Sequence, residues 1–228
     1  MFRITGLFLL LSNLMIGQVV SKTTDFKNTN ENPYYSNIDT SSNNLNFYIS
    51  IGKNNTTFDY KNSRNDINDN LNSSLGNVIE LGVDNIASLL GLRLGLEFEI
   101  IDYNAIGDNQ EVNFKWETTY IGINGNLTKS LPVLSKTNLE VQMGIGLQHI
   151  LDGNQTLGNE VINLQNNNEF NGVFGDIDLG IGLMLLQQKE FTGGIFLSFV
   201  KSYSLDYDSQ ENLDFSSFQL KIRLCSKN

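Results

Sequence analysis

The sequence predicts an all-β protein, folded as an eight-stranded antiparallel up-and-down transmembrane β-barrel. Its segments alternate between apolar residues and glycine, carboxylate or amide residues. In 139–148 the odd positions are Leu, Val, Met, Ile and Leu, and the even positions are Glu, Gln, Gly, Gly and Gln. Side chains alternate faces along a strand, so each segment has one apolar and one small or polar face. An N-terminal secretion signal and alternating loop lengths support the same prediction.

The chain opens with the signal peptide, predicted over 1–21. Arg3 supplies a positive charge, and residues 8–11 and 14–16 supply a short apolar stretch, with cleavage after Gly17 or Ser21. A retained transmembrane helix is disfavoured because polar residues and glycines interrupt the stretch, which is short for a span of about 20 residues. Residues 22–44, rich in Asn, Ser, Thr and Asp, are predicted to form a flexible periplasmic lead-in. The barrel is predicted over 45–228.

Eight alternating segments follow in this part of the chain. A helix would space its apolar residues at three and four, whereas here they recur at two. The predicted strands are 45–62, 77–86, 92–103, 113–127, 138–150, 171–186, 191–204 and 214–225.

The connections alternate between short and long. The short ones are 87–91, 128–137 and 187–190, and the longer ones 63–76, 104–112, 151–170 and 205–213. Outer-membrane barrels with an even number of strands keep both termini and the short turns in the periplasm, and the longer loops outside. The pattern therefore predicts a bacterial outer-membrane location.

The same alternation would also fit a soluble periplasmic ligand-binding barrel, with the apolar edge lining a cavity. A water-facing edge normally carries long charged side chains. Here the other edge is instead rich in glycine, as at Gly82, Gly144 and Gly182. Glycine in a strand needs a reason such as close packing, and the narrow interior of an eight-stranded barrel provides one. We therefore expect the apolar edge to face lipid.

On this model ten charged residues point into the lumen. Arg93, Lys221 and Arg223 are expected to bridge to Glu97, to Glu140 and to an Asp176/Asp178 pair, forming a polar plug. Because acids outnumber bases, some acids should lie near the wet mouths or share protons. The predicted lumen residues are Glu80, Asp84, Arg93, Glu97, Glu99, Glu140, Asp176, Asp178, Lys221 and Arg223.

Aromatic residues near the strand ends are expected to divide between interfacial girdles and the lumen. They are Tyr48, Phe58, Tyr60, Trp116, Tyr120, Phe196, Tyr203 and Tyr207.

Three stretches resemble the outer-membrane β-barrel domain (porin-like) proteins of Bacteroidota. They are 52–63 (GKNNTTFDYKNS), GLEF at 95–98 with YNA at 103–105, and WETTYIG at 116–122. The likeness extends over most of 45–225 and implies an eight-stranded up-and-down barrel of mostly unassigned function. Such chains often end on an aromatic residue used in assembly, whereas this one ends LCSKN. Recognition by the barrel-assembly machinery is then expected to use Phe218 or an internal signal.

Composition and motifs exclude several functions. With 15 basic and 25 acidic residues the chain has a formal charge of −10, which disfavours nucleic-acid binding. His149 is the only histidine. It lacks the serine two positions later found in lipid hydrolases built on small barrels, so no enzyme is expected. Carboxylates at spacing two, Glu97/Glu99 and Asp176/Asp178, could bind a cation, but a salt-bridge plug gives the same spacing. No cofactor or metal is predicted.

The sequence thus favours a monomer surrounded by outer-membrane lipid, with a structural or interaction role. Loops 63–76 and 151–170 are predicted to contact an extracellular partner. The alternatives are a narrow porin for small cations, a lipid-modifying enzyme and the soluble ligand-binding barrel.

Overall fold

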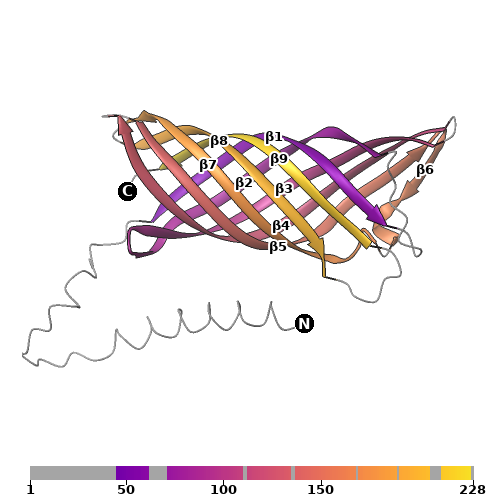
Figure 1. Ribbon diagram of the computed structural model, residues 1–228, viewed down its shortest axis with the longest axis horizontal. Coiled ribbons are helices and arrows are strands. Elements are labelled where there is room, and N and C mark those ends of the chain that lie inside the picture. The colour runs from indigo at the N-terminus through magenta and orange to yellow at the C-terminus, as the bar shows by residue number, and fades with distance from the viewer. Residues whose placement is uncertain are drawn as a thin grey trace, which may run out of the picture. The chain divides into compact units, whose positions relative to one another are not determined.

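The computed structural model describes residues 45–61, 71–109, 112–134, 137–167, 169–188, 190–205 and 212–226. The predicted signal peptide and lead-in lie outside these residues. Eight strands form the barrel (Figure 1): β1 Asn46–Lys61, β2 Leu71–Leu89, β3 Leu92–Asn109, β4 Val112–Leu134, β5 Thr137–Leu157, β7 Val173–Gln187, β8 Phe191–Ser204 and β9 Asn212–Ser226. A short strand, β6 (Glu160–Asn163), and a 3₁₀ turn, η1 (Leu164–Asn166), follow β5. None of the helical structure described is long and apolar enough to cross a membrane.

The sheet closes on itself. Each barrel strand pairs antiparallel with its neighbours along the chain, and β9 returns to pair with β1 from Tyr48↔Cys225 to Lys61↔Asn212. β6 pairs only with the end of β5 and stands outside the closed ring. The predicted fold class, a closed eight-stranded antiparallel up-and-down barrel, is confirmed.

The strands extend further than predicted at the loop end. β2 begins at Leu71, inside the predicted loop 63–76, and β3 and β4 reach Asn109 and Val112, so only 110–111 separate them. Similarly, 151–157 continue β5, and β6 and η1 occupy part of the predicted loop 151–170. The backbone ladder continues where the apolar alternation becomes irregular, because exposed Leu75, Ile106 and Leu151 are interspersed with polar residues in these extensions.

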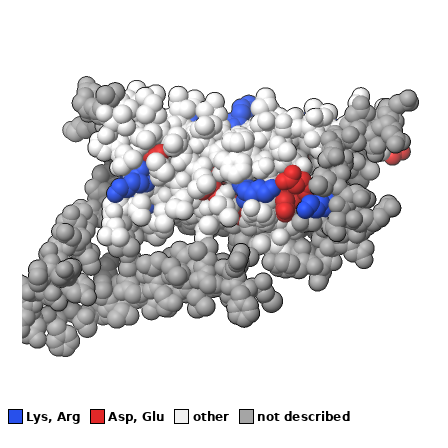
Figure 2. Space-filling model, viewed as in Figure 1, with Lys and Arg blue, Asp and Glu red and all other residues white. Residues whose placement is uncertain are grey.

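The apolar edge faces outward along every barrel strand. On β7, for example, Ile177, Leu179 and Ile181 are each at least half exposed. From Ile177 to Leu185 the strand rises about 26 Å, or roughly 20 Å along the axis at a tilt of ~40°. Figure 2 shows a face covered mostly by uncharged atoms, with few charges. This band is the surface that a membrane barrel presents to lipid and is the opposite of a lipocalin-like arrangement.

The inner face explains the glycines. Tyr48 pairs directly with Gly82 across β1 and β2, and a Cβ on Gly82 would lie 2.2 Å from the Tyr48 ring. Phe196 covers Gly182 in the same way, at 2.3 Å from such a Cβ. Glycine is needed at these positions because an aromatic ring of the neighbouring strand occupies the space that a Cβ would take.

We predict that Gly82→Ala and Gly182→Ala each lower the free energy of unfolding by about 1–3 kcal/mol, because the added methyl group displaces a packed ring. Gly125→Ala is the matched control, since a Cβ at that glycine meets nothing within 4 Å. It should be neutral or slightly stabilising. Urea unfolding followed by the fluorescence of Trp116, the single tryptophan, measures all three variants. Equal midpoints for Gly82→Ala and Gly125→Ala would contradict this packing.

Candidate functional site

The structure places all ten charged residues of the sequence prediction on the inner face of the barrel. Asp84 and Arg93 are partly exposed near one end. The other eight are buried: Glu80, Glu97, Glu99, Glu140, Asp176, Asp178, Lys221 and Arg223.

Arg223 lies at the centre of this lumen network. Its Nε donates to Ser50 Oγ at 2.9 Å, and its Nη1 donates to Gln142 Oε1 at 2.8 Å. Its Nη2 donates to Glu80 at 3.2 Å and to Glu97 at 3.4 Å. The guanidinium thereby links β9 to side chains on β1, β2, β3 and β5, across the whole section of the barrel.

The guanidinium also stacks between two rings. The Cζ of Arg223 lies 4.2 Å from the centroid of Tyr48 and 4.1 Å from that of Phe196. These are the rings that lie over Gly82 and Gly182, so the glycines make room for the stack. A planar cation between two aromatic faces gains cation–π attraction and excludes water from the lumen centre.

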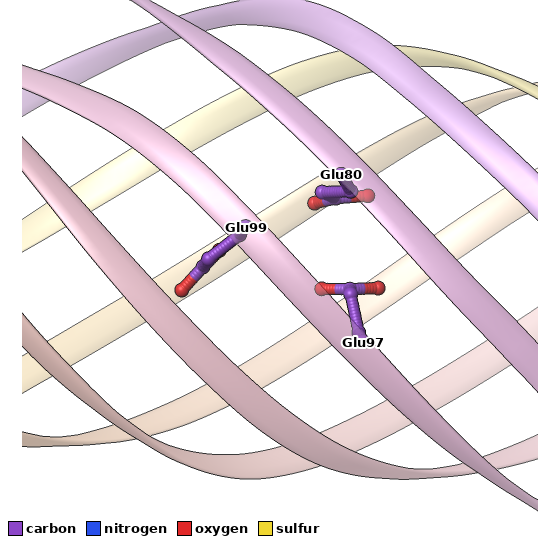
Figure 3. Close-up of side chains that lie close together, drawn as sticks. All are labelled: Glu80, Glu97 and Glu99. Atoms are coloured by element: carbon purple, nitrogen blue, oxygen red, sulfur yellow. The ribbon is translucent and has the colours of Figure 1, made fainter.

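Lys221 supplies the second buried cation. Its Nζ donates to a Glu80 oxygen, and the Tyr48 hydroxyl donates to Glu97 at 2.6 Å. Figure 3 shows the carboxylates of Glu80 from β2 and Glu97 from β3 close together, with Glu99 from β3 beside them. One oxygen from each lies within 4.8 Å of the others.

Arg93 forms a separate group nearer the end of the barrel at which the described chain begins. Its Nε donates to Asp84 at 2.7 Å and its Nη2 to Glu140 at 2.6 Å. These three charges are less buried than the Arg223 network, so water screens them more strongly. Arg93, Asp84 and Glu140 thus fill the lumen nearer the barrel end than the Arg223 network does.

The expected bridges to Asp176 and Asp178 are wrong. Within the described residues no basic atom lies within 4.0 Å of either carboxylate, and Lys221 and Arg223 pair with Glu80 and Glu97 instead. Asp176 accepts a hydrogen bond from Gln148 Nε2 at 2.7 Å. Alternation assigns a side chain to the lumen, but partners across the lumen depend on the stagger of the strands, which alternation does not encode.

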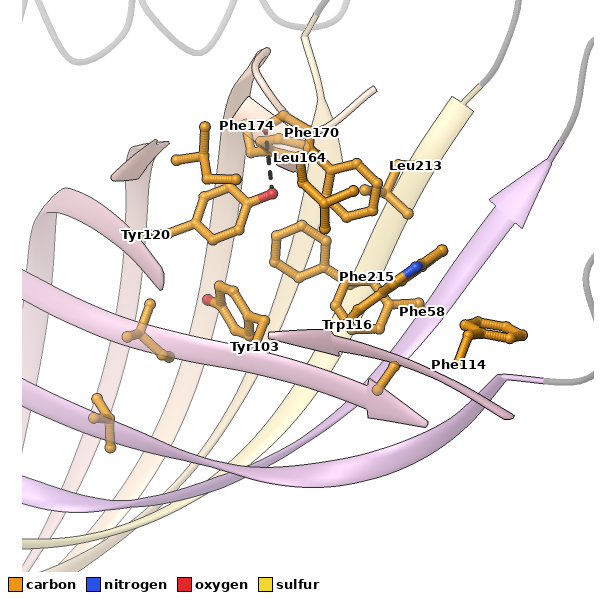
Figure 4. Close-up of a cluster of buried hydrophobic side chains, with 14 residues drawn as sticks. Phe58, Tyr103, Phe114, Trp116, Tyr120, Leu164, Phe170, Phe174, Leu213 and Phe215 are labelled. Carbon is orange, nitrogen blue, oxygen red and sulfur yellow. Dashed lines mark hydrogen bonds between the residues drawn. The ribbon is translucent and has the colours of Figure 1, made fainter. Parts of the chain in front are cut away.

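A cluster of aromatic and aliphatic side chains fills the lumen at the other end (Figure 4). The Trp116 ring packs edge-on against Phe170 at 5.0 Å between centroids, and Tyr103 lies 4.4 Å from Phe215. The cluster, here called the aromatic plug, comprises Phe58, Val78, Ile101, Tyr103, Ala105, Phe114, Trp116, Tyr120, Ile150, Leu164, Phe170, Phe174, Leu213 and Phe215.

The sequence analysis only partly anticipated the aromatic plug. Of the aromatic residues it singled out, Phe58, Trp116 and Tyr120 belong to the plug, whereas Tyr203 is exposed on the outer face and Tyr207 lies outside the described residues. Inward parity was the available signal for the strand residues. Leu164 carried no such signal because it comes from the connection after β6, not from a barrel strand.

His149 lies on the outer face of β5, where its side chain is exposed. Its Nδ1 is 3.3 Å from the carbonyl oxygen of Gly172. Cys225 is a free, partly buried thiol in β9. The absence of enzymatic activity stays a prediction, because the position of one histidine does not test it.

No family model matches this chain, and no curated protein matches its sequence. Solved structures that resemble it include Neisserial surface protein A (10% identity, TM-score 0.46, 80% of this chain and 97% of that chain). OprG, an outer membrane protein from Pseudomonas aeruginosa, matches with 9% identity and a TM-score of 0.43, over 79% of this chain and 94% of that chain. The outer membrane enzyme PagL matches with 9% identity and a TM-score of 0.38, over 78% and 97%. These values show no family, and the Bacteroidota family stays a prediction.

We predict that Arg223→Met lowers the free energy of unfolding by about 3–5 kcal/mol, because it leaves Glu80 and Glu97 buried with one cation fewer. The free energy of unfolding of Arg223→Lys should lie between those of this variant and wild type. An ammonium keeps the positive charge but loses the multiple hydrogen bonds of the planar guanidinium and its stacking between the two rings. Lys201→Met is the control. Its ion pair with Asp59 (2.8 Å) is partly exposed and should contribute less than about 1 kcal/mol. Urea midpoints that fall equally for Arg223→Met and Lys201→Met would refute the central role of Arg223.

Proposed function

We propose that the protein spans the bacterial outer membrane as a monomeric barrel and acts through its external end, in a structural or interaction role. The outward apolar band supports the membrane location, because an exposed band of this height is stable only against lipid. The observation that carries the functional proposal is the filled lumen. Arg223 and its partners close it at one level and the aromatic plug closes it at another. Passage of solutes is therefore not the activity we propose.

The end bearing β6 provides a candidate interaction platform, defined as residues 154–166. The tip of β5 pairs with β6 from Asn154↔Asn163 to Leu157↔Glu160, and the hairpin turns at Gly158, whose φ is +59°. Val161 and Ile162 are 68% and 46% exposed on this hairpin. β-Branched residues held on a strand and open to solvent are suited to contact with a partner.

The platform is held to the barrel by its own connection. Leu164 is fully buried and Phe170 is 2% exposed, both within the aromatic plug. The Gln165 side chain donates to the backbone carbonyl of Leu151. The backbone N–H of Gln165 donates to Asn163 Oδ1 at 2.7 Å. A surface already ordered in this way loses little conformational entropy on binding. We therefore place the proposed recognition of an extracellular partner here. Residues 63–70 of the other predicted contact loop lie outside the described residues.

A narrow cation porin is the second candidate, because acids outnumber bases in the lumen. It requires Arg223 and the aromatic plug to move aside. Outer-membrane lipid and the barrel-assembly machinery remain proposed partners in either case.

We predict that the protein sediments with outer membranes, runs at different positions in boiled and unboiled gel lanes, and gives no steady conductance in a planar bilayer. The first two results follow from a closed barrel in lipid and the third from the filled lumen. A single band in the soluble periplasm would refute the membrane proposal. A cation-selective conductance that falls in Glu99→Gln would favour the porin instead.

We predict that Phe170→Ala loosens the platform while leaving the barrel closed. A buried phenylalanine truncated to alanine costs about 3–5 kcal/mol, which sets the upper limit of the effect. Amide hydrogen exchange in 160–167 should accelerate at least tenfold, whereas exchange in β7, β8 and β9 should not change. Val161→Ala, at an exposed position, is the control and should leave exchange unaltered. Unchanged exchange in Phe170→Ala would show that the plug does not anchor this segment.

A further inference from the structure

Negative charge exceeds positive charge in the central lumen. Lys221 and Arg223 form their ion pairs with Glu80 and Glu97. Across the described residues, Glu99, Asp176 and Asp178 have no basic atom within 4.0 Å. All three are buried, between 3% and 6% exposed. A buried carboxylate needs a compensating charge if it is to stay ionised, and the protein side chains described here leave three without one.

The carboxylates of Glu80, Glu97 and Glu99 converge closely enough to share one ion. One oxygen of each lies within 4.8 Å of the others (Figure 3). Two oxygens bound to a calcium ion at about 2.4 Å can be separated by up to ~4.8 Å. Glu80 is already engaged by both cations, so an added ion would be held mainly by Glu97 and Glu99.

Asp178 provides an independent observation. It comes from β7, a different part of the barrel wall from β2 and β3, and is 6% exposed. Its Oδ1 makes no hydrogen bond within the described structure. Asp178 pairs with Gly144, where a Cβ would lie 3.5 Å from the Cβ of Asp178 and 3.7 Å from that of Asn126. Asn126 donates to the Tyr48 hydroxyl, which itself donates to Glu97, so Asp178 lies on the inner face beside the same layer of side chains. Buried polar atoms in native proteins nearly always have a partner, and an unpartnered carboxylate oxygen beside other carboxylates fits a missing cation.

We propose that the lumen binds one divalent cation of the calcium class, held by Glu97 and Glu99, with Asp178 contributing from the β7 side. Every candidate donor is a carboxylate oxygen, and no cysteine or histidine takes part. Such oxygen donors suit Ca²⁺ better than a transition metal. The ion would join β3 to β7 through the lumen and stabilise the barrel as Arg223 does. This site is independent of the external platform and would stand if that role failed.

The test is to refold the full chain into detergent micelles with CaCl₂ or with EDTA. Bound calcium is measured by mass spectrometry after desalting, and the thermal midpoint by the fluorescence of Trp116. Wild type should retain about one Ca²⁺ per chain and show a higher midpoint in CaCl₂. Glu99→Gln and Asp178→Asn should lose both effects. Glu140→Gln is the matched control, because it removes an acid that Arg93 already neutralises in the same lumen, and should retain both.

Two results would overturn the proposal. In the first, wild type retains no calcium and Glu99→Gln is more stable than wild type in both buffers, which means that protons neutralise the carboxylates. In the second, calcium raises the midpoints of wild type, Glu99→Gln and Asp178→Asn equally, which assigns the effect to the outer surface. If Glu99→Gln fails to fold, the calcium content of wild type and of Asp178→Asn decides the question.

Discussion

The stack of Tyr48, Arg223 and Phe196 is the constraint around which the rest of the barrel is arranged. The interior of an eight-stranded barrel is only wide enough for side chains, so whatever fills it must fit closely. The stack fits because Gly82 and Gly182 leave the backbone bare beneath its two rings. The guanidinium between the rings in turn neutralises carboxylates from β2 and β3. Substitution at one glycine therefore acts on the charges of the lumen as well as on packing.

The two halves of the lumen are filled by different kinds of side chain. In the central layer, buried charges are stabilised by direct partners, as Glu80 is by Lys221. At the loop end the aromatic plug needs few polar partners because it consists almost entirely of rings and aliphatic groups. This division matches the outer surface, which is apolar alongside the central layer. Charges inside and hydrocarbon outside are compatible only because the ladder is closed and leaves no unpaired backbone edge in the band.

Alternation at period two predicted the fold because strand geometry is local, and eight of the ten charged residues that it assigned to the lumen are buried. It could not predict partners. Arg93 does meet Glu140, but Asp176 and Asp178 meet no base among the described residues, since strand stagger decides which side chains face each other across the lumen. The strand extension at 104–109 was also missed, because Asn, Gly and Asp resemble a loop where ladder pairing in fact continues. Leu164 and Phe170 were not predicted to be buried because they lie in the connection between β6 and β7, where residues do not alternate between two faces.

Phe170 links the interior to the external surface. The side chain of Phe170 belongs to the aromatic plug and also holds the chain just after the platform. The filling of the lumen and the position of the platform therefore both depend on this one residue. By contrast, all four residues of β6 are exposed and contact β5 through the backbone ladder. Substitutions at Val161 or Ile162 are therefore expected to alter the proposed partner contact while leaving the lumen unchanged. A scaffold whose stability resides in the lumen and whose contact residues lie outside it can change partners without losing its fold.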